Sequence, residues 1–416
     1  MVLLLNRVKK NFIRLLLAVL LWILFAYNYL INYRYTWYYR YNRNEKDLHI
    51  EMNRQFQSAQ NYWNQLLRKE KFKLNSYNFS SDICTILITS PRYEHPTLHY
   101  TLSSLVSSMT YEDKISTKIF IYNTAKPSSL HKHAEQLSQV EIPFLEVIHL
   151  PSIDVEIVQQ KTQSDQWAFR ETIDYLSALS FCEKQKPNNI LILEDDLLFT
   201  KNFFSKLRTI ISNNQHSRCS LIKLFKTDYW DGWERKHAPY LILLSLSISL
   251  LINFLFILLD EKFSLRSIRL YTKSLFSMVI SFSFTLLWFV FILILILSVN
   301  RQNFQFLFGI QHGLHIMKSS TAGTLAQVYS SNVVQSLQSF ILEQVHSNKS
   351  VPIDILLNDF FEKHQSTYLQ CHAIPDLVNH IGVYSSNKNK NQGNFLSMKQ
   401  SGTFEYDQAA FPIVSS

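Results

Sequence analysis

Two long apolar runs without a single charge lie in the middle of the chain and constrain its fold more than any other feature. They cover residues 238–259 and 275–299. Each run exceeds the ~20 residues that a helix needs to cross the hydrocarbon core of a bilayer. Two buried core helices are the alternative, but the helices of globular proteins rarely run so long without a polar face. The pattern therefore predicts two transmembrane helices.

The segment between the two runs, 260–274, predicts how the hairpin is oriented, because short cytoplasmic loops are enriched in lysine and arginine. Its basic residues are Lys262, Arg266, Arg269 and Lys273. A third apolar run near the N-terminus follows basic residues and is too long for a cleaved signal peptide. We expect a cytoplasmic N-terminal tail over 1–11 and a retained membrane anchor over 12–33. The glycosylation sequons at Asn78 and Asn348 fall on the lumenal side of this arrangement.

Glycine is scarce, and its distribution excludes several nucleotide-binding motifs. The chain of 416 residues has seven glycines, and none of them precedes Gly232. The sequence therefore contains neither a glycine-rich dinucleotide fingerprint nor a phosphate-binding P-loop. Any bound nucleotide would need its phosphates neutralised in another way, most simply by a metal ion.

Charge and cysteine usage narrow the class of protein further. The net charge of +9 does not indicate a nucleic-acid partner, since no basic stripe is interleaved with stacking aromatic residues. We assign the excess to lysine and arginine that flank membrane segments. The cysteines form no CxxC motif, but their even number permits two disulfides in an oxidising lumen, with the pairing left open. They are Cys84, Cys182, Cys219 and Cys371.

The soluble segments alternate between strand and helix patterns. Strands are predicted at 83–89, 118–123, 144–150 and 189–193, and a helix at 164–184. Such alternation is typical of an α/β fold with a mostly parallel sheet and flanking helices. The predicted parts are a stem helix over 34–79, two α/β segments over 80–237 and 300–395, and a tail over 396–416. The two α/β segments are either two small domains or one domain that the hairpin interrupts.

Three consecutive carboxylates, Glu194-Asp195-Asp196, follow the predicted strand 189–193 directly. Ligands bind at the carboxyl ends of strands in open α/β sheets. Adjacent carboxylates repel each other unless a cation is present, and a hard divalent ion with oxygen ligands fits this position. An ordinary acidic turn that caps the next helix is the alternative. The apolar residues on both sides of the cluster favour the metal site.

This combination of anchor, α/β domain and strand-terminal acids resembles the GT-A glycosyltransferases, whose acidic motif binds Mn²⁺ and a nucleotide-sugar diphosphate. The Glu-Asp-Asp variant of the motif is shared with the N-glycan GlcNAc-transferase IV group. A transmembrane hairpin soon after the motif is rarer and is similar to that of the GPI-glycan GalNAc transferases of the Golgi. The resemblance implies a GT-A-like fold, interrupted by the hairpin.

The segments that carry the resemblance lie within residues 80–390. They are 88–92, 190–199, 222–225 with Trp230, Gly232 and Trp233, 320–324, 328–330, 352–357 and 375–386. One departure is found after the hairpin, where the family often carries cysteines and this chain reads Thr321-Ala322-Gly323-Thr324. That departure puts in doubt a disulfide that the family would imply there.

The resemblance also implies a role for each candidate site residue. Asp196 and Glu194 would contact the metal ion together with His380, and Asp354 would deprotonate the attacking hydroxyl in an inverting transfer. Donor binding would fall to Thr89, Arg92, Glu194 and Asp195. Substrate binding would fall to Trp230, Trp233, Gly323 and Thr324.

Each role has a simpler alternative. His380 could be structural, Asp354 could cap the helix after Pro352, and Arg92 could be a surface residue. The two tryptophans could anchor the chain at the membrane interface. Four further histidines lack any ligand-like pattern and are expected to be solvated: His95, His99, His131 and His133.

The sequence therefore predicts a multi-pass Golgi enzyme that uses Mn²⁺ to transfer GalNAc from UDP-GalNAc to a mannose of the GPI-anchor glycan. Its partners would be the UDP-sugar donor, the GPI glycan acceptor and the lipid bilayer. A GlcNAc transferase that acts on N-glycans is one alternative. A non-enzymatic multi-pass membrane protein is another, although the predicted spans contain no ionisable residue that would mark a permeation path.

Overall fold

The computed structural model describes most of the chain and divides it into two compact units. The described ranges are 2–28, 57–65, 82–91, 97–150, 163–226, 237–262, 275–299, 313–317, 323–347 and 351–381. One unit comprises Met1–His49 and Asp231–Ile310, and the other comprises Ile50–Trp230 and Gln311–Ser416. Each unit is therefore built from two separate stretches of sequence.

The first unit contains three apolar helices, α1 (Val2–Asn28), α9 (Ala238–Lys262) and α10 (Leu275–Val299). The helices α9 and α10 are long and apolar enough to cross a membrane, whereas the apolar part of α1 is shorter. Leucine and isoleucine side chains pack α9 against α10, and Asn253 Nδ2 donates a hydrogen bond to Thr285 Oγ1 between them. Two candidate spans indicate a membrane protein, while the N-terminal anchor stays a prediction.

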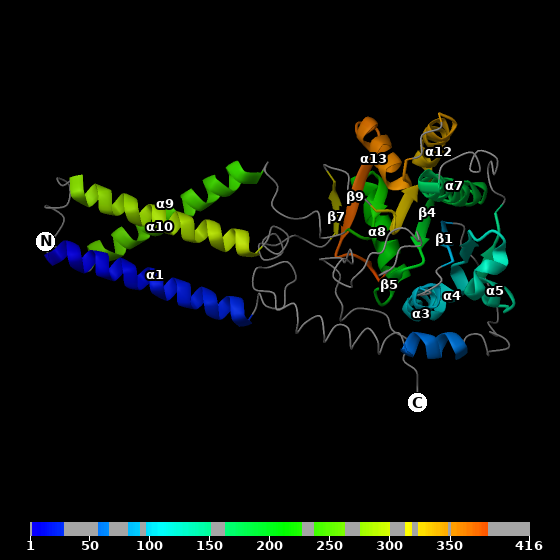
Figure 1. Ribbon diagram of the computed structural model, residues 1–416, viewed down its shortest axis with the longest axis horizontal. Coiled ribbons are helices and arrows are strands. Elements are labelled where there is room, and N and C mark those ends of the chain that lie inside the picture. The colour runs from blue at the N-terminus through cyan, green and yellow to red at the C-terminus, as the bar shows by residue number, and fades with distance from the viewer. Residues whose placement is uncertain are drawn as a thin grey trace. The chain divides into compact units, whose positions relative to one another are not determined.

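The second unit is a mixed α/β domain (Figure 1). Before the hairpin it contains β1 (Ile83–Thr89), α3 (Leu98–Ser108), α4 (Tyr111–Ser116), β2 (Ile119–Asn123), α5 (Lys132–Ser138), β3 (Leu145–Ile148), α7 (Gln163–Lys184), β4 (Asn189–Glu194), β5 (Leu197–Phe199), α8 (Phe203–Ser217) and β6 (Cys219–Lys223). After the hairpin it contains β7 (Gly313–Ile316), β8 (Ala326–Ser330), α12 (Ser331–His346), α13 (Ile353–Lys363), β9 (Leu369–Ile374) and β10 (Val378–His380). The predicted strands and the predicted helix 164–184 are all present, with ends shifted by a few residues.

Eight strands form one mostly parallel sheet in the order β3-β2-β1-β4-β8-β6-β9-β7. The pairs β3/β2, β2/β1, β1/β4 and β6/β9 are parallel, and β8 runs antiparallel between β4 and β6. The chain leaves the sheet after β6, forms the hairpin, and supplies β7, β8 and β9 on its return. The two lumenal segments predicted from the sequence thus build one sheet together.

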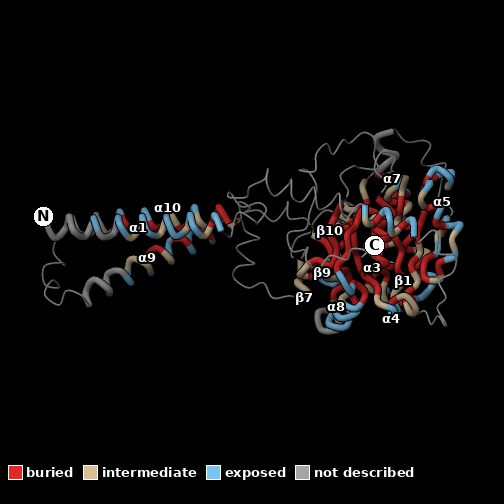
Figure 2. Tube along the Cα trace, turned by 90° about the horizontal axis from the view of Figure 1, so that it is seen from below, coloured by how far each residue is buried: buried red, intermediate tan, exposed pale blue. Residues whose placement is uncertain are grey.

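Successive apolar side chains of each strand point to opposite faces of the sheet and fill a core on each face. One face is covered by α7, α12 and α13, and the other by α3, α5 and α8. Figure 2 shows the buried residues concentrated in this unit, whereas α1, α9 and α10 expose many of their side chains. A sheet buried on both faces explains why its strands read as nearly continuous apolar runs.

Two disulfides join elements that are distant in the sequence, as the even number of cysteines permits. Cys84 of β1 pairs with Cys182 of α7, and Cys219 of β6 pairs with Cys371 of β9. The second bond connects chain from before and after the hairpin. In the predicted stem, the described residues 57–65 are helical and pack on the domain, where Trp63 is buried in the core.

Candidate active site

The acidic cluster lies at the carboxyl end of β4, where the chain turns from Glu194 into β5. Asp195 is 3% exposed and Asp196 is 4% exposed. The burial follows from the sequence, because β5 is apolar and pairs with β10 in a second, two-stranded sheet. The turn is therefore an interior feature of the domain and is not solvated.

Asp195 is held in place by hydroxyl groups from two other elements. Its Oδ2 accepts a hydrogen bond of 2.6 Å from Thr89 Oγ1 at the end of β1, and Thr101 Oγ1 of α3 donates to its carbonyl oxygen at 2.7 Å. Thr89 Oγ1 also lies 2.6 Å from His131 Nε2. Because the single hydroxyl hydrogen of Thr89 is used on the carboxylate, His131 is the donor in that second bond. The result is a buried chain His131–Thr89–Asp195.

Asp196 contacts His380, which lies 184 positions later in the sequence. Its Oδ2 lies 3.1 Å from His380 Nε2, and its carbonyl oxygen accepts from Ile381 N at 2.8 Å. The β10 strand brings the histidine there, because His380 pairs with Leu197 of β5. His380 is 7% exposed, and its Nδ1 is buried without a hydrogen-bond partner in the part of the chain that the structure describes.

The Glu194 side chain points to the face of the sheet opposite to that of Asp195. It contacts the loop that follows the hairpin. Thr324 Oγ1 donates a hydrogen bond to Glu194 Oε1. The preceding residue, Gly323, has a φ of +107°, a conformation that residues with a Cβ rarely adopt. Gln327 Nε2 of β8 donates to the carbonyl oxygen of Gly323 at 2.9 Å and holds the loop against the sheet.

The donor set can be tested for its fit to a divalent metal ion. Within the described ranges, no group of three or more His, Cys, Asp or Glu side chains is arranged to hold one. Asp196 and His380 nevertheless converge at one buried point and offer one oxygen and one nitrogen donor. Both donor types suit a first-row divalent ion, and ions at nucleotide sites take further ligands from phosphate and water. These two side chains are compatible with a divalent ion that takes its remaining ligands from elsewhere, and the metal ion stays a prediction.

A second group of polar residues lies on the α13 face of the same sheet edge. Lys223 ends β6, and His372 of β9 is bonded to Asp376 Oδ1. Burial lowers the pKa of Lys223 to about 8; the Asp354 carboxylate of α13 opposes this shift, and Lys226 adds to it. Asp354 is half-buried in the first turn of α13, where its Oδ1 accepts from the next backbone N–H at 2.9 Å.

The structure brings several predicted site residues together and leaves others outside the described ranges. Thr89 contacts Asp195, Asp196 contacts His380, and Glu194 contacts Thr324 beside Gly323. The Asp354 carboxylate opposes the lowering of the Lys223 pKa. The described ranges do not include Arg92, Trp230 or Trp233, nor the sequon residues Asn78 and Asn348.

Sequence reasoning assigned no functional role to three features of the site: His131, Lys223 and the His372–Asp376 pair. The expectation of solvated histidines is wrong for His99 and His131, which are both buried, while His133 is partly buried and His95 lies outside the described ranges. Lys223 and the His372–Asp376 pair received no predicted role, although Lys223 and Asp376 lie in the segments 222–225 and 375–386 that carry the resemblance. The available signal for Lys223 was its position as a lone lysine at the end of the apolar run Cys219–Lys223. No local pattern marks His131, because its partner is supplied by β1.

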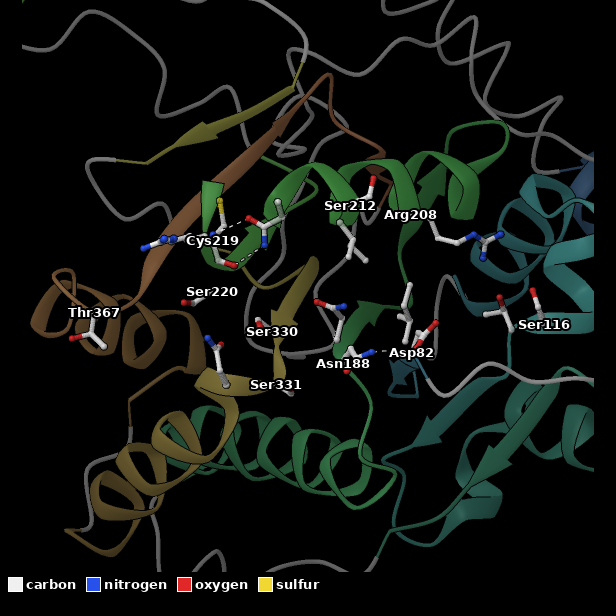
Figure 3. A pocket seen from close by; sticks show the side chains of 17 residues that line it. Asp82, Ser116, Asn188, Arg208, Ser212, Cys219, Ser220, Ser330, Ser331 and Thr367 are labelled. Atoms are coloured by element: carbon white, nitrogen blue, oxygen red, sulfur yellow. Dashed lines mark hydrogen bonds between the residues drawn. The ribbon is translucent and has the colours of Figure 1, made fainter. Parts of the chain in front are cut away.

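A polar groove of about 1080 Å³ lies at the opposite edge of the sheet (Figure 3). It is formed where β1, β4 and β6 begin and where β8 ends. Several of its polar groups are already bonded to each other: Asn188 donates to Asp82 at 3.2 Å, and Asn214 exchanges two bonds of 2.8 Å with the backbone of Cys219. None of the predicted site residues lines it.

The sequence profile described as "GPI-N-acetylgalactosamine transferase PGAP4" matches residues 83–379 of this chain. The chain belongs to this family of glycosyltransferases. The match includes the acidic cluster and α13, and it confirms the family that the sequence resembles. The relation to the GT-A enzymes and to the GlcNAc-transferase IV group stays a prediction.

Other comparisons add little beyond the family. No curated protein matches the chain. Among solved structures, it is similar to the mannosyltransferase Ktr4p from S. cerevisiae in complex with GDP, with 10% identity and a TM-score of 0.20. That match covers 42% of this chain, which spans about half (50%) of the length of the mannosyltransferase. A TM-score of this size does not establish a shared fold.

Proposed function

We propose that this protein transfers GalNAc from UDP-GalNAc to a mannose of the GPI-anchor glycan, in the Golgi lumen and with inversion at the anomeric carbon. The single observation that carries the proposal is the family match over residues 83–379, which spans both the acidic cluster and α13. The buried polar groups at the carboxyl edge of the sheet support this location for the site.

In the proposed reaction, the Asp354 carboxylate takes the proton from the attacking hydroxyl of the acceptor. The acceptor oxygen forms a bond to the anomeric carbon of GalNAc while the bond from that carbon to the phosphate oxygen breaks, and UDP leaves with the electron pair. Attack from the face opposite the leaving group inverts the configuration. The half-buried position of Asp354 in the first turn of α13 supports this role.

The proposed donor site is built around the acidic turn. Mn²⁺, when bound, would neutralise the diphosphate and stabilise the departing UDP. Asp196 and His380 would hold the ion, and Thr89 would orient Asp195 toward it. Glu194 and Thr324 would bind the nucleotide from the other face of the sheet, at the loop that Gly323 allows to turn.

The hairpin gives a physical reason for a lipid-linked acceptor. The two candidate spans lie between β6 and β7 in the sequence. They would therefore attach the catalytic unit to the membrane at a point within its own sequence. A GPI glycan is attached to a lipid, and its mannoses stay close to the bilayer. In this proposal the N-terminus is cytoplasmic and the α/β unit is lumenal. Trp230, Trp233 and Arg92 keep their predicted roles toward substrate and donor.

Mass spectrometry of GPI glycans tests the proposal. Cells that lack their own GPI-GalNAc activity would receive the wild-type chain or the double variant Asp195→Ala/Asp196→Ala. We expect the wild type to restore GalNAc on the GPI glycan and the double variant to restore none. The double variant Asp359→Ala/Glu362→Ala removes two exposed acids of α13 and serves as the matched control. Restoration by the first double variant would overturn the site, and a wild type without GalNAc would overturn the function.

A further inference from the structure

Gln327 is a buried amide in the strand β8, and hydrogen bonds hold it on both sides. Only 1% of the residue is exposed. Its Oε1 accepts from the hydroxyl of Tyr175 at 3.0 Å and from the hydroxyl of Tyr329, and its Nε2 donates to the carbonyl oxygen of Gly323 at 2.9 Å. A buried amide costs free energy unless it is hydrogen-bonded, and a satisfied polar network specifies one local arrangement. The contacts of Gln327 therefore fix the geometry between α7, β8 and the loop before β8.

The two tyrosines determine which way the amide group points. Tyr175 of α7 and Tyr329 of β8 are both buried, and their hydroxyl oxygens lie 2.8 Å apart. Burial raises the pKa of Tyr175 well above its ordinary value, and so does the neighbouring Tyr329 hydroxyl. The carboxylates of Glu194 and Glu171 act on this pKa in the same direction. Tyr175 therefore keeps its proton and donates it to the amide oxygen, which leaves the amide nitrogen of Gln327 directed toward the loop.

Glu194 of the acidic turn lies on the same face of the sheet as Gln327. In the register of the sheet, Gln327 pairs with Ile192 of β4 and with Lys223 of β6, and residues in register share a face. Glu194 follows Ile192 by two positions on the same strand, so its side chain points to that face as well. This is the face that α7 covers, with Tyr175 and Ile192 in one core.

The loop that Gln327 holds is also the loop that holds Glu194. Thr324 Oγ1 donates to Glu194 Oε1, and Glu194 N donates to the carbonyl oxygen of Leu325 at 2.9 Å. Gly323 has a φ of +107°, and a Cβ there would meet no described atom within 4 Å. The glycine is therefore required by the backbone conformation and not by crowding. The hydrogen bond from Gln327 to its carbonyl oxygen fixes this turn beside Thr324.

We propose that Gln327 is a positioning residue for the nucleotide-sugar donor. It holds the Gly323 carbonyl group, and through this turn it places Thr324 and Glu194 where they bind the nucleotide. The proposal rests on the donor site proposed above and adds the group that fixes one side of it. The two tyrosines act one step further away, because they orient the amide of Gln327. The amide itself touches neither donor nor acceptor in this mechanism.

Steady-state kinetics of the full-length enzyme in membranes test the proposal. Gln327→Met keeps the length of the side chain and removes the N–H that faces Gly323. With UDP-GalNAc and a GPI glycolipid acceptor, the KM for UDP-GalNAc should rise about tenfold, while the KM for the acceptor should not change. Gln335→Met removes an exposed glutamine of α12 and should leave both KM values at the wild-type level. A loss of kcat with both KM values unchanged would indicate a structural role and overturn the proposal.

Tyr175→Phe is a second variant, with a smaller change at the same network. It removes a hydroxyl that orients Gln327 and keeps the ring, so the KM for UDP-GalNAc should rise about threefold. Tyr368→Phe is the matched control, because its hydroxyl contacts Ser336 on the surface of the domain. An unchanged donor KM in both Gln327→Met and Tyr175→Phe would contradict the proposal.

A double-variant cycle tests whether Gln327 acts through Thr324. Thr324→Val removes the hydroxyl that donates to Glu194. If the two residues act on one turn, Gln327→Met should raise the donor KM much less in the Thr324→Val background than in the wild type. An equal tenfold rise in both backgrounds would show that Gln327 acts by another route and would refute the proposal.

Direct binding of UDP separates this inference from the proposed function. The purified full-length wild type and Gln327→Met would be titrated with UDP and Mn²⁺ by calorimetry, and we expect about tenfold weaker binding in the variant. That result together with a wild type that transfers no GalNAc to a GPI acceptor would support the inference and overturn the proposed function. Equal affinities, or a wild type that does not bind UDP, would overturn the inference.

Discussion

The two edges of the central sheet differ in how they hold polar side chains. At the carboxyl edge, Asp195, Asp196 and Lys223 are almost completely buried. The two aspartates are hydrogen-bonded to Thr89 and His380, which come from distant parts of the chain. At the amino edge, the polar groove contains groups that stay near water, such as the Arg208 side chain, which is 44% exposed in its ion pair with Asp113. The same strands form both edges, and the two edges are the opposite ends of those strands.

This difference indicates where the chain gives up stability for function. Removing an ion from water costs several kcal/mol, whereas an exposed ion pair contributes about 0–1 kcal/mol. Folding alone does not require the buried acids and the buried lysine, because apolar residues would fill their positions. At the amino edge, the buried carboxylate of Asp113 is paired with an arginine that stays near water. We therefore expect substitutions at the carboxyl edge to affect activity strongly and substitutions at the amino edge to affect it little.

The largest effect is expected for Asp354→Asn, which keeps the shape of the side chain and removes its basicity. A general base contributes about 10² to 10⁴ to the rate, so kcat should fall by a factor in that range. Steady-state kinetics with UDP-GalNAc and a GPI acceptor would measure it. Asp359→Asn, on an exposed face of the same helix, should retain wild-type kinetics. Wild-type kcat in Asp354→Asn would remove α13 from the mechanism.

A smaller effect is expected for Thr89→Val, which removes the hydroxyl between Asp195 and His131 without changing the shape. Loss of a group that orients a metal-site carboxylate costs about 10- to 100-fold in metal affinity or activity. A titration of activity with Mn²⁺ should show a weaker apparent affinity. Thr85→Val is a matched control, because Thr85 lies on the same strand and its buried hydroxyl has no partner among the described residues. Equal titrations for the two variants would show that Thr89 is only a packing residue.

The smallest effect is expected at the amino edge. Arg218→Ala and Asn332→Ala remove two groups that line the groove. Surface substitutions usually change stability by less than about 0.5 kcal/mol, and we expect transfer activity within about twofold of the wild type. A tenfold loss in the GPI-glycan assay would contradict the comparison between the edges and would make the groove part of the substrate path.

Local sequence patterns predicted the individual elements of the sheet but did not predict which elements meet. Continuous apolar runs marked the strands, and the position of the acids at the end of β4 marked the site edge. The pairing of β8 with both β4 and β6 was not accessible, because the strands are separated by the hairpin. For the same reason the cysteine pairing stayed open until the register was known.

The site residues show the same division. Asp196 and His380 were both singled out, although only the resemblance joined them, since no spacing connects positions 184 residues apart. Lys223 and His131 were missed because their importance depends on neighbours from other strands and helices. Burial of a polar residue depends on tertiary structure, and one residue in an apolar run is a weak signal of it.

The place of the hairpin in the chain also has a consequence for biosynthesis. Because β8 lies between β4 and β6 but follows the hairpin in the sequence, these two strands lack their shared neighbour while the first half of the domain is being made. The partner of Cys219 likewise emerges only with β9. The sheet cannot close until the ribosome has delivered α9, α10 and most of the chain beyond them. The α/β unit therefore cannot complete its sheet before both candidate membrane helices have been synthesised.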